Sequence, residues 1–397
     1  VMLKSAPEVS RSGDVTYPYR QNNAMLYLTG CTEPNVDCLM YMAQGRLIRT
    51  LSCPETDAQK SQWIGPWTTE KTACEHYGVE QAVSHPQWPA YLKEVLGLIQ
   101  VVYLDLKNPT LKLTALQKHF SFDLEDVMPL LEQQRLVKDA YEIDVLKTVC
   151  RQSAQAHRAV MQSCQPDWTE AHVEAMFLQQ GRIQGPQHLA YPTIAAGGEH
   201  ACILHYTRND ASLNAEDLLL IDAGMELEGY AADITRTFPV SGRFSDSHKA
   251  LYDIVLAAQT TAIAQIKPGE NWASISLVAE QVLIEGLVSL GILSGTVEHC
   301  LETEALRPFF PHRLGHHLGL DVHDVPEVHG ITDPFEVGHV ITIEPGLYCG
   351  AHLDIDPRWQ GIGIRIEDDI WVTETGACVL TDAVPKTVDD IESLMCA

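Results

Sequence analysis

The chain has 397 residues, of which 53 are acidic and 27 are basic, so its formal net charge is −26 at pH 7. Such an acidic balance, without a cluster of lysine or arginine, argues against nucleic acid or an anionic membrane as a partner. Hydrophobic residues make up 45% and charged residues 20% of the chain, as in a folded globular protein with room for two domains.

The distribution of cysteines and the length of the apolar runs indicate the cellular compartment. The eleven cysteines are scattered without a C-x-x-C pair, which favours reduced thiols over a disulfide framework. The first residues lack the apolar segment of a secretory signal. No apolar run approaches the roughly 20 residues that a membrane span needs. We therefore expect a cytoplasmic protein with no membrane partner.

Residues 1–126 are expected to form a small α/β domain. Short apolar runs separated by turn residues occupy 24–51 and are expected to be strands, beginning with the run at 24–29, and residues 98–106 are typical of another, buried strand. Helices are expected from Pro89 to Gly97, since proline suits a first helical turn, and at 111–120. This part contains no glycine-rich phosphate loop and no clustered His, Cys or Asp, so we do not expect it to carry catalysis alone.

Residues 135–397 are expected to form a second domain of the α+β class. Amphipathic helical patterns begin near Lys138 and cover about 247–266 and 272–290. Strands are expected at 218–222, 231–238, 340–344 and 363–372. Antiparallel strands with helices packed on a face make an α+β arrangement.

Two aspartates, Asp222 and Asp233, lie eleven residues apart in or beside runs of strand-forming residues. A buried carboxylate with few basic neighbours is costly, and a bound cation removes that cost. Further along, a strand ends at Glu344, and strand alternation places Glu367 on the same face as Arg365. The four acids therefore predict a metal site shared between distant strands.

Histidines supply the nitrogen ligands that such a site needs. Residues 311–324 contain four of them, and His205 ends an earlier apolar run. His312 and His316 are four residues apart, but Arg313 and the following Gly315 rule out the helical H-E-x-x-H zinc motif. Two Asp, two Glu and one His suit two adjacent divalent ions, with Mn²⁺ favoured and Co²⁺ or Zn²⁺ as alternatives. Among the neighbouring residues, His317 is expected to be structural, and Asp368 and Asp369 are expected to be either solvated or supporting the ligands.

The order of these motifs resembles the pita-bread metallopeptidases, most closely their proline-specific branch of Xaa-Pro dipeptidase (prolidase) and aminopeptidase P. The resemblance rests on ITRTFPVSG, GHHLGLDVHD, TIEPGLY and GIRIEDD. It covers essentially all of 135–397, which implies a pita-bread catalytic domain. The first 126 residues resemble the creatinase-type N-terminal domain more loosely. In this family that domain implies oligomerisation, as a homodimer or homotetramer, and shielding of the active site.

The resemblance also implies a role for each residue that matches a family motif. Asp222 would bind one metal ion, His316 and Glu344 mainly the other, and Asp233 and Glu367 would bridge both. Glu344 would also carry a proton to the leaving nitrogen. The remaining implied roles are substrate contact for His205 and His323, support of the tetrahedral intermediate for His312, and support of the ligands for Tyr348 and Arg365.

These residues imply a hydrolase that cleaves small peptides before proline by means of a hydroxide bridging two metal ions. The nitrogen of that bond carries no hydrogen and must be protonated to leave, which a carboxylic acid can do. We expect Xaa-Pro dipeptides as substrates first, with aminopeptidase P action on longer peptides as the alternative. A member of the fold without peptidase activity and a side activity on phosphotriesters are the further alternatives.

One stretch departs from the family pattern. The loop at 325–339 contains no Lys or Arg, whereas prolidases and many aminopeptidases P carry an arginine there, which in prolidases holds the carboxylate of the substrate. Arg313, beside His312, is our candidate to replace it as a substrate-binding residue. An unchanged KM for an Xaa-Pro dipeptide in Arg313→Ala would disprove this role.

Overall fold

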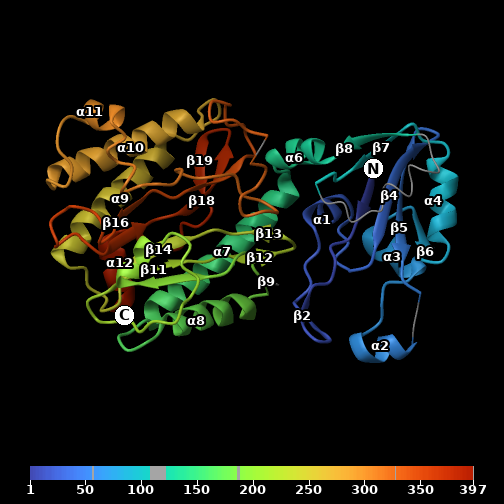
Figure 1. Cartoon of the computed structure of the whole chain (residues 1–397), viewed down its shortest axis with the longest axis horizontal. Helices are drawn as coiled ribbons and strands as arrows, with labels where there is room; N and C mark the ends of the chain where they lie inside the picture. The colour runs from blue at the N-terminus through green and yellow to red at the C-terminus, as the bar shows by residue number, and fades with distance from the viewer. Residues whose placement is uncertain (56–57, 108–121, 186–187, 327, 397) are drawn as a thin grey trace. The chain divides into compact units, whose positions relative to one another are not determined.

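The structure is a computed structural model that describes every residue except 56–57, 108–121, 186–187, 327 and 397. The chain divides into two compact units, Val1–Gln134 and Arg135–Ala397 (Figure 1). The helix expected at 111–120 lies outside the described residues.

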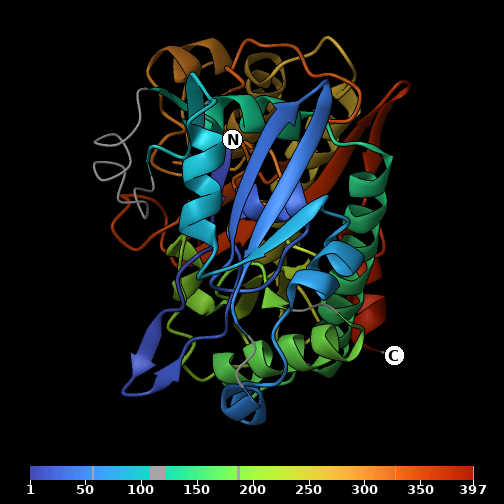
Figure 2. The ribbon, with the colours of Figure 1, turned by 90° about the vertical axis from the view of Figure 1, so that its right-hand side faces the viewer.

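The N-terminal unit is built on a four-stranded sheet in the order β1-β4-β5-β6, in which only the pair β5–β6 is parallel. Figure 2 shows the long strands β4 and β5 side by side. A further parallel pair is β7–β8 and a small hairpin is β2–β3. The strands are β1 (Met2–Lys4), β2 (Ser10–Ser12), β3 (Val15–Thr16), β4 (Asp37–Ala43), β5 (Arg46–Cys53), β6 (Gln81–Ser84), β7 (Val101–Leu104) and β8 (Asp123–Asp126).

Helices complete this unit and confirm its α/β class. The expected helix at 89–97 is α4, with proline in its first turn. The apolar run at 24–29 is a helix, not a strand, because Asn22 caps the backbone N–H of Met25 and Gly30 ends it with a positive φ. The helices are α1 (Asn23–Thr29), α2 (Ala58–Ile64), α3 (Glu70–Tyr77), α4 (Trp88–Leu96) and α6 (Met128–Leu136), which spans the division.

The C-terminal unit contains two sets of antiparallel strands. The first set forms the sheets β10-β11-β14 and β13-β12-β9, and the second forms β15-β18-β19 and β16-β17. The strands are β9 (His188–Leu189), β10 (Ile194–Gly197), β11 (Leu218–Asp222), β12 (Met225–Leu227), β13 (Tyr230–Ala231), β14 (Thr235–Pro239), β15 (Val340–Ile343), β16 (Gly346–Cys349), β17 (Ile362–Arg365), β18 (Asp368–Thr373) and β19 (Gly376–Val379).

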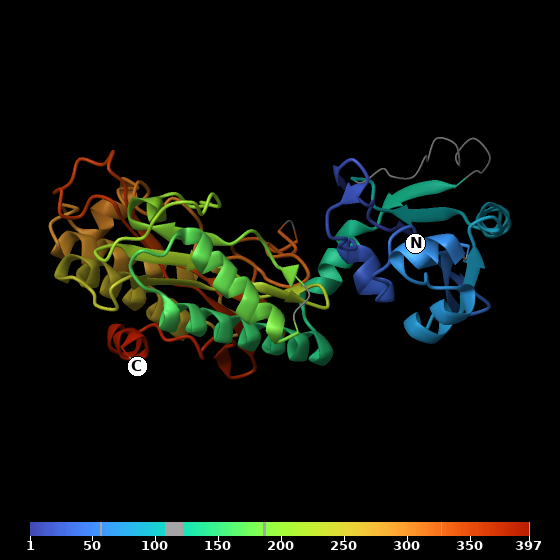
Figure 3. The same cartoon turned by 90° about the horizontal axis from the view of Figure 1, so that it is seen from below.

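Helices pack on both strand sets, as Figure 3 shows from below. The pair α7–α8 contacts strands of the first set, and α9, paired with α10, contacts β15, β16, β17 and β19. β17 also contacts β11 and β14, so the two sets meet there. The helices are α7 (Ala140–Ser163), α8 (Glu170–Ile183), the 3₁₀ turn η1 (Gly198–Cys202), α9 (Asp246–Gln265), α10 (Trp272–Ser289), α11 (Val297–Glu302) and α12 (Val388–Met395).

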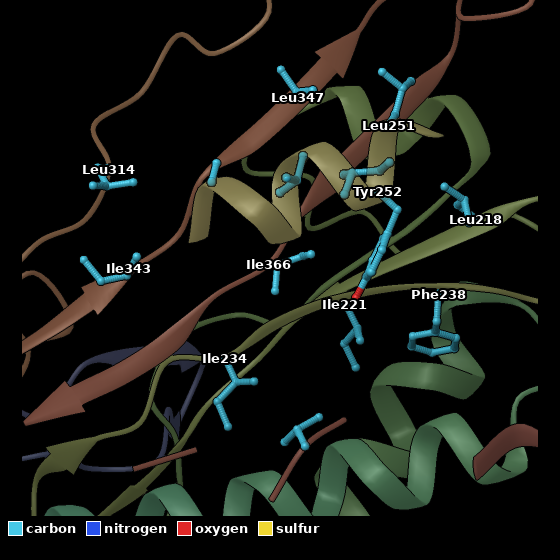
Figure 4. Close-up of a cluster of buried hydrophobic side chains, with 14 of the residues drawn as sticks. Leu218, Ile221, Ile234, Phe238, Leu251, Tyr252, Leu314, Ile343, Leu347 and Ile366 are labelled. Atoms are coloured by element: carbon cyan, nitrogen blue, oxygen red, sulfur yellow. The ribbon is translucent and has the colours of Figure 1, made fainter. Parts of the chain in front are cut away.

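A large apolar core joins the two strand sets. Figure 4 shows side chains from both, among them Ile221, Phe238, Ile343 and Ile366, each 0% exposed. α10 is apolar and long enough to span a membrane by composition alone. It packs on α9, and five of its residues are buried, so we interpret it as a helix of this core.

The aspartate hairpin, which is the segment at 218–238 that carries Asp222 and Asp233, differs in one respect from the expected pair of continuous strands. β11 and β14 pair antiparallel, as expected, and the register places Asp222 opposite Thr235. The residues between them leave this sheet and form the hairpin β12–β13. Gly224 permits the crossing, since a Cβ there would lie 1.7 Å from the carbonyl oxygen of Ala232. Asp233 consequently lies in an irregular segment before β14, not within a strand.

Candidate metal centre

Strand ends and the irregular segments beside them bring the predicted ligands together. Asp222 is the last residue of β11, and Asp233 lies two residues before β14. Glu344 directly follows β15, and Glu367 lies in the break between β17 and β18. The strand expected at 363–372 is interrupted at this break. Glu367 is held there because its backbone N–H donates to the carbonyl oxygen of Thr235 at 3.0 Å.

His316 is held against β15 by backbone contacts. The backbone N–H of Glu344 donates to the carbonyl oxygen of Leu314 at 2.8 Å, and the backbone N–H of Thr342 donates to the carbonyl oxygen of His316 at 2.8 Å. Gly315 permits this approach, because a Cβ there would lie 2.0 Å from the carbonyl oxygen of Thr342. The segment 314–316 therefore runs directly beside the strand that ends at Glu344.

One cavity of about 340 Å³ collects these groups. It is lined by every residue proposed from the sequence as a metal ligand, catalytic group or substrate contact except Tyr348. The lining residues from that set are His205, Asp222, Asp233, His312, Arg313, His316, His323, Glu344, Arg365 and Glu367.

Three of the predicted ligands are close enough to share one ion. One ligand atom each from Asp233, His316 and Glu367 lies within 4.8 Å of the other two. His316 Nε2 lies 3.5 Å from carboxylate oxygens of both Asp233 and Glu344. Its Nδ1 donates to the carbonyl oxygen of His317 at 3.0 Å, which leaves a lone pair on Nε2 when the ring is neutral.

Tyr191 connects the two aspartates. Its hydroxyl lies 2.6 Å from Asp222 Oδ1 and 2.5 Å from Asp233 Oδ1. A phenol has one proton to donate, so it bonds to one carboxylate at a time. Burial, reinforced by the neighbouring carboxylates, raises the pKa of Tyr191 well above its ordinary value, so this proton stays in place.

Arg365 begins a chain of hydrogen bonds that ends at His312. Arg365 donates to Asp222 Oδ2 at 2.6 Å and to the hydroxyl oxygen of Tyr348 at 2.9 Å. Because the carbonyl oxygen of Arg313 can only accept, the proton of the neutral His312 ring is on Nδ1, and Nε2 accepts the proton of the Tyr348 hydroxyl, 2.8 Å away. His312 Nδ1 then donates to the carbonyl oxygen of Arg313 at 2.8 Å. Burial, with Arg365 next, lowers the pKa of His312 to about 4, so this ring is neutral.

Three predicted substrate contacts lie at the rim. His205, His323 and Arg313 are exposed and line the cavity. His323 packs edge-on against His316, with ring centroids 4.3 Å apart. These side chains can reach a molecule that enters the cavity, whereas the carboxylates lie deeper.

The electrostatics of the cavity fit divalent cations. Burial and the neighbouring carboxylates raise the pKa of Glu367 well above its ordinary range, and burial raises that of Glu344 to about 7. Burial also raises the pKa of Asp222, against the opposing effect of Arg365. Burial alone would raise the pKa of Asp233 too, but His316 lowers it overall. An oxygen-rich set of buried acids that repel one another is a donor set that hard or borderline divalent ions stabilise.

Asp368 and Asp369 are supporting residues and are not solvated, since both are 0% exposed. Asp368 forms ion pairs with Arg236 and Lys386, both at 2.7 Å. Asp369 accepts a hydrogen bond from the backbone N–H of Asp233 at 3.0 Å and so positions that ligand.

Two supporting residues were missed from the sequence: Tyr191 and Thr235. Thr235 donates to Glu367 Oε2 at 2.7 Å and accepts from Arg365. Its position two residues after Asp233 was a usable signal, because alternate residues of an extended chain share a face. Tyr191 lies 31 residues before Asp222 in a loop, and no local pattern marks it.

Comparison with known proteins identifies the family. Residues 144–374 match metallopeptidase family M24, and residues 1–103 match the N-terminal domain of aminopeptidase P. The chain belongs to metallopeptidase family M24. This confirms the expected membership of the proline-specific pita-bread metallopeptidases and the expected fold of both parts. Members of M24 use divalent metal ions, in agreement with the donor set.

The M24 relatives extend over the whole chain. The Xaa-Pro aminopeptidase of Escherichia coli is 37% identical, with 100% of this chain and 93% of the relative covered. The Xaa-Pro aminopeptidase of Haemophilus influenzae is 38% identical with the same coverage. Among solved structures, proline aminopeptidase P II from Yersinia pestis superposes with a TM-score of 0.94 at 38% identity, covering 100% of this chain and 94% of that one.

Proposed function

We propose that this protein is an aminopeptidase P, which removes the N-terminal residue from peptides whose second residue is proline. The observation that carries the proposal is the full-length similarity to relatives named Xaa-Pro aminopeptidase, at 37% and 38% identity. This similarity favours aminopeptidase P, which was the alternative in the sequence analysis, over a dipeptidase, which was the first choice.

The shape of the site supports longer substrates. A second cavity of about 310 Å³ lies beside the cavity that holds the candidate ligands, since both are lined by His312, Arg313 and His316. The second cavity extends past Trp272 and Ile331. A dipeptide ends at its proline, whereas a longer peptide has further residues to place, and this extension offers them room.

The residues of this chain suggest how the scissile bond is handled. Two divalent ions, with Mn²⁺ as our choice, would be held by Asp222, Asp233, His316, Glu344 and Glu367, and would supply a nucleophile and polarise the carbonyl. Glu344 has a pKa of about 7 in the ion-free site, and we assign it to proton transfer to the proline nitrogen, which has no hydrogen of its own. His205 and His323, at the rim, would position the peptide.

His312 acts in this proposal through its fixed orientation. Both of its ring nitrogens are engaged, Nε2 with Tyr348 and Nδ1 with Arg313. The ring therefore contacts substrate only if it gives up one of these bonds. Arg365 holds the chain of hydrogen bonds in place from the Asp222 side.

A paired assay tests the proposal. Mn²⁺-loaded protein is incubated with Ala-Pro and with Ala-Pro-Ala, and the released alanine is measured. We expect the tripeptide to be cleaved with at least tenfold higher kcat/KM than the dipeptide. Preferred hydrolysis of Ala-Pro would restore the dipeptidase interpretation. Repeating the assay with Co²⁺ and Zn²⁺ tests the choice of metal.

Arg313 has a different role under this proposal. Its exposed side chain lines both cavities, so it can meet the carboxyl-terminal end of a short peptide. We expect Arg313→Ala to raise KM for Ala-Pro-Ala several-fold and to leave a longer peptide amide unaffected. Equal KM changes for the two substrates would contradict carboxylate recognition.

A further inference from the structure

Three histidines outside the ligand set form a second cluster beside the metal centre. His317 follows the candidate ligand His316, while His329 lies in the loop before β15 and His339 immediately precedes that strand. One nitrogen from each lies within 4.8 Å of the other two. Their ring centroids are 4.8 to 5.1 Å apart, with steep interplanar angles.

Four ring nitrogens of this cluster are buried without a hydrogen-bond partner among the described residues. They are both nitrogens of His317, Nδ1 of His329 and Nε2 of His339. The side chains are well enclosed, since His317 is 4% exposed and His339 is 0% exposed. Buried polar atoms in folded proteins nearly always have a bonding partner. Four unpartnered nitrogens in one place therefore indicate that the cluster binds a ligand.

The hydrogen bond made by the second nitrogen of a ring determines whether the unpartnered nitrogen has a lone pair for a cation. His329 Nε2 donates to the carbonyl oxygen of Pro334 at 3.2 Å, so its Nδ1 presents a lone pair to the cluster. Metal-bound histidines typically donate their second nitrogen to a carbonyl in this way. His339 Nδ1 instead accepts a long bond of 3.3 Å from the backbone N–H of Glu336. A cation that binds His339 Nε2 requires the ring proton to move from Nε2 to Nδ1. The hydrogen bond from the backbone N–H of Glu336 to Nδ1 is then lost.

The charges around the cluster do not oppose a cation strongly. Lys138 lies close enough to affect these rings, but its ammonium is paired with Asp324 at 2.9 Å, and both side chains are buried. Asp324 is paired in addition with Arg135. Burial, followed by His329 and Lys138, lowers the pKa of His339 to about 3, so this ring is neutral at physiological pH, as metal binding requires.

The surroundings leave space for a fourth ligand. Trp272 packs edge-on against His317, and Phe335 stacks on His329 and packs edge-on against His339. His317 and His329 also line the cavity of about 310 Å³, which can supply a water molecule. Three histidines and a water are a common tetrahedral set for Zn²⁺.

We propose that His317, His329 and His339 form a third divalent-metal site that prefers Zn²⁺. A set of neutral nitrogen donors favours Zn²⁺ over Mn²⁺, in contrast to the carboxylate-rich centre next to it. Zn–N bonds of about 2.0–2.1 Å need the nitrogens to approach to about 3.4 Å. The bound ion would tie the loop at 328–339 to the segment that carries His316.

The matched variant is His329→Phe, which keeps an aromatic ring against Phe335 but removes the ligand nitrogen. His352→Phe, an exposed position in the same unit, is the control. Each chelator-stripped protein is loaded with excess Zn²⁺, desalted and analysed for metal. We expect three ions per chain for the wild type and His352→Phe, and two for His329→Phe. Two ions in the wild type, or three in folded His329→Phe, would overturn the proposal.

A measurement on the wild type keeps the proposal testable if the variant fails to fold. Zn²⁺ is added in one equivalent to Mn²⁺-saturated protein, and hydrogen exchange of residues 328–339 is followed. We expect at least a fivefold slowing there with Zn²⁺ and none with one further equivalent of Mn²⁺. Unchanged exchange with Zn²⁺ would mean that the rings form only an aromatic cluster.

Discussion

Single side chains behind the ligands decide how the carboxylates of the metal centre are oriented. Tyr191 donates to Asp222 or Asp233, Thr235 donates to Glu367, and Asp369 holds the backbone of Asp233. None of these residues needs to touch a metal ion. Supporting hydrogen bonds of this kind commonly change metal affinity by one to two orders of magnitude.

Tyr191→Phe tests this support directly. Loss of the hydroxyl removes the proton shared by Asp222 and Asp233, so we expect Mn²⁺ affinity to fall about 10- to 100-fold, with a parallel loss of kcat/KM below saturating metal. Calorimetric Mn²⁺ titration provides the measurement. Tyr230→Phe is the control, since that buried hydroxyl donates to Glu142. An unchanged affinity in Tyr191→Phe would remove Tyr191 from the site.

His157, which contacts the chain just after Asp222, makes the stability of the fold depend on pH in the acid range. It is fully enclosed, donates from Nε2 to the carbonyl oxygen of Ala223 at 2.8 Å and packs against Phe177. Burial lowers its pKa to about 3. Between pH 6.5 and pH 3 the unfolded chain therefore binds a proton at this residue that the folded chain does not. The free energy of unfolding must fall as the pH falls through this window.

His157→Phe should flatten that dependence. The wild type loses up to about 1.4 kcal/mol per pH unit through this one group, and the variant loses none of it. We also expect the variant to be less stable at pH 7 by about 1 kcal/mol, because the carbonyl of Ala223 loses its donor. Urea unfolding from pH 7 to pH 4 in the presence of chelator measures both effects. An identical pH slope would show that His157 is not neutral in the fold.

At the scale of elements, the metal centre depends on close approaches between segments that pair outside regular strands. The segment at 314–316 lies against β15, and the chain at 223–224 crosses beside 232–234. Both contacts need glycine, since a Cβ at Gly315 or Gly224 would overlap a backbone carbonyl. These glycines fix where His316 and Asp233 stand.

Gly315→Ala is expected to displace His316. The added Cβ would meet the carbonyl oxygen of Thr342 at 2.0 Å, which forces the segment away from Glu344 at a cost of about 1–3 kcal/mol. We expect a lower urea midpoint and at least a tenfold loss of Mn²⁺ affinity. Gly97→Ala, in the N-terminal unit with its nearest atom at 3.3 Å, should leave Mn²⁺ binding unchanged. Normal Mn²⁺ binding by Gly315→Ala would contradict this account.

At the scale of the whole molecule, the candidate chemistry belongs to one unit. Every described residue that lines the two cavities lies in Arg135–Ala397. That unit has its own large hydrophobic core, which extends from Val149 to Ile391. The N-terminal unit has separate apolar clusters. Folding and metal binding of the C-terminal unit are therefore expected to be self-sufficient.

A fragment of residues 128–397, which retains the whole of α6, tests this expectation. It should unfold cooperatively in urea and bind Mn²⁺ within about threefold of the full chain, because no ligand is removed. Circular dichroism and calorimetric titration measure these properties. A fragment without a cooperative transition would show that the N-terminal unit is needed for stability, and a folded fragment without metal binding would show that it shapes the site.

The class of both parts and a candidate ligand set for the metal centre could be predicted from the sequence. The long helices α7, α9 and α10 and the strand at 218–222 follow from local periodicity, which a single sequence displays directly. The candidate ligands stand in short motifs that match those of the family, so the resemblance implied their roles without coordinates. The helix at 24–29 was misjudged because its cap, Asn22, outweighs an apolar run that is also typical of a strand.

The residues behind and beside those ligands became known only from the fold. Tyr191 reaches Asp222 across 31 residues, and His329 and His339 reach His317 across a loop. Such contacts depend on how separate segments pack, and hydrophobic periodicity carries no record of them. His317 illustrates the difference. The sequence predicts a structural histidine, whereas the fold surrounds it with two further imidazoles and leaves both of its nitrogens without a partner among the described residues.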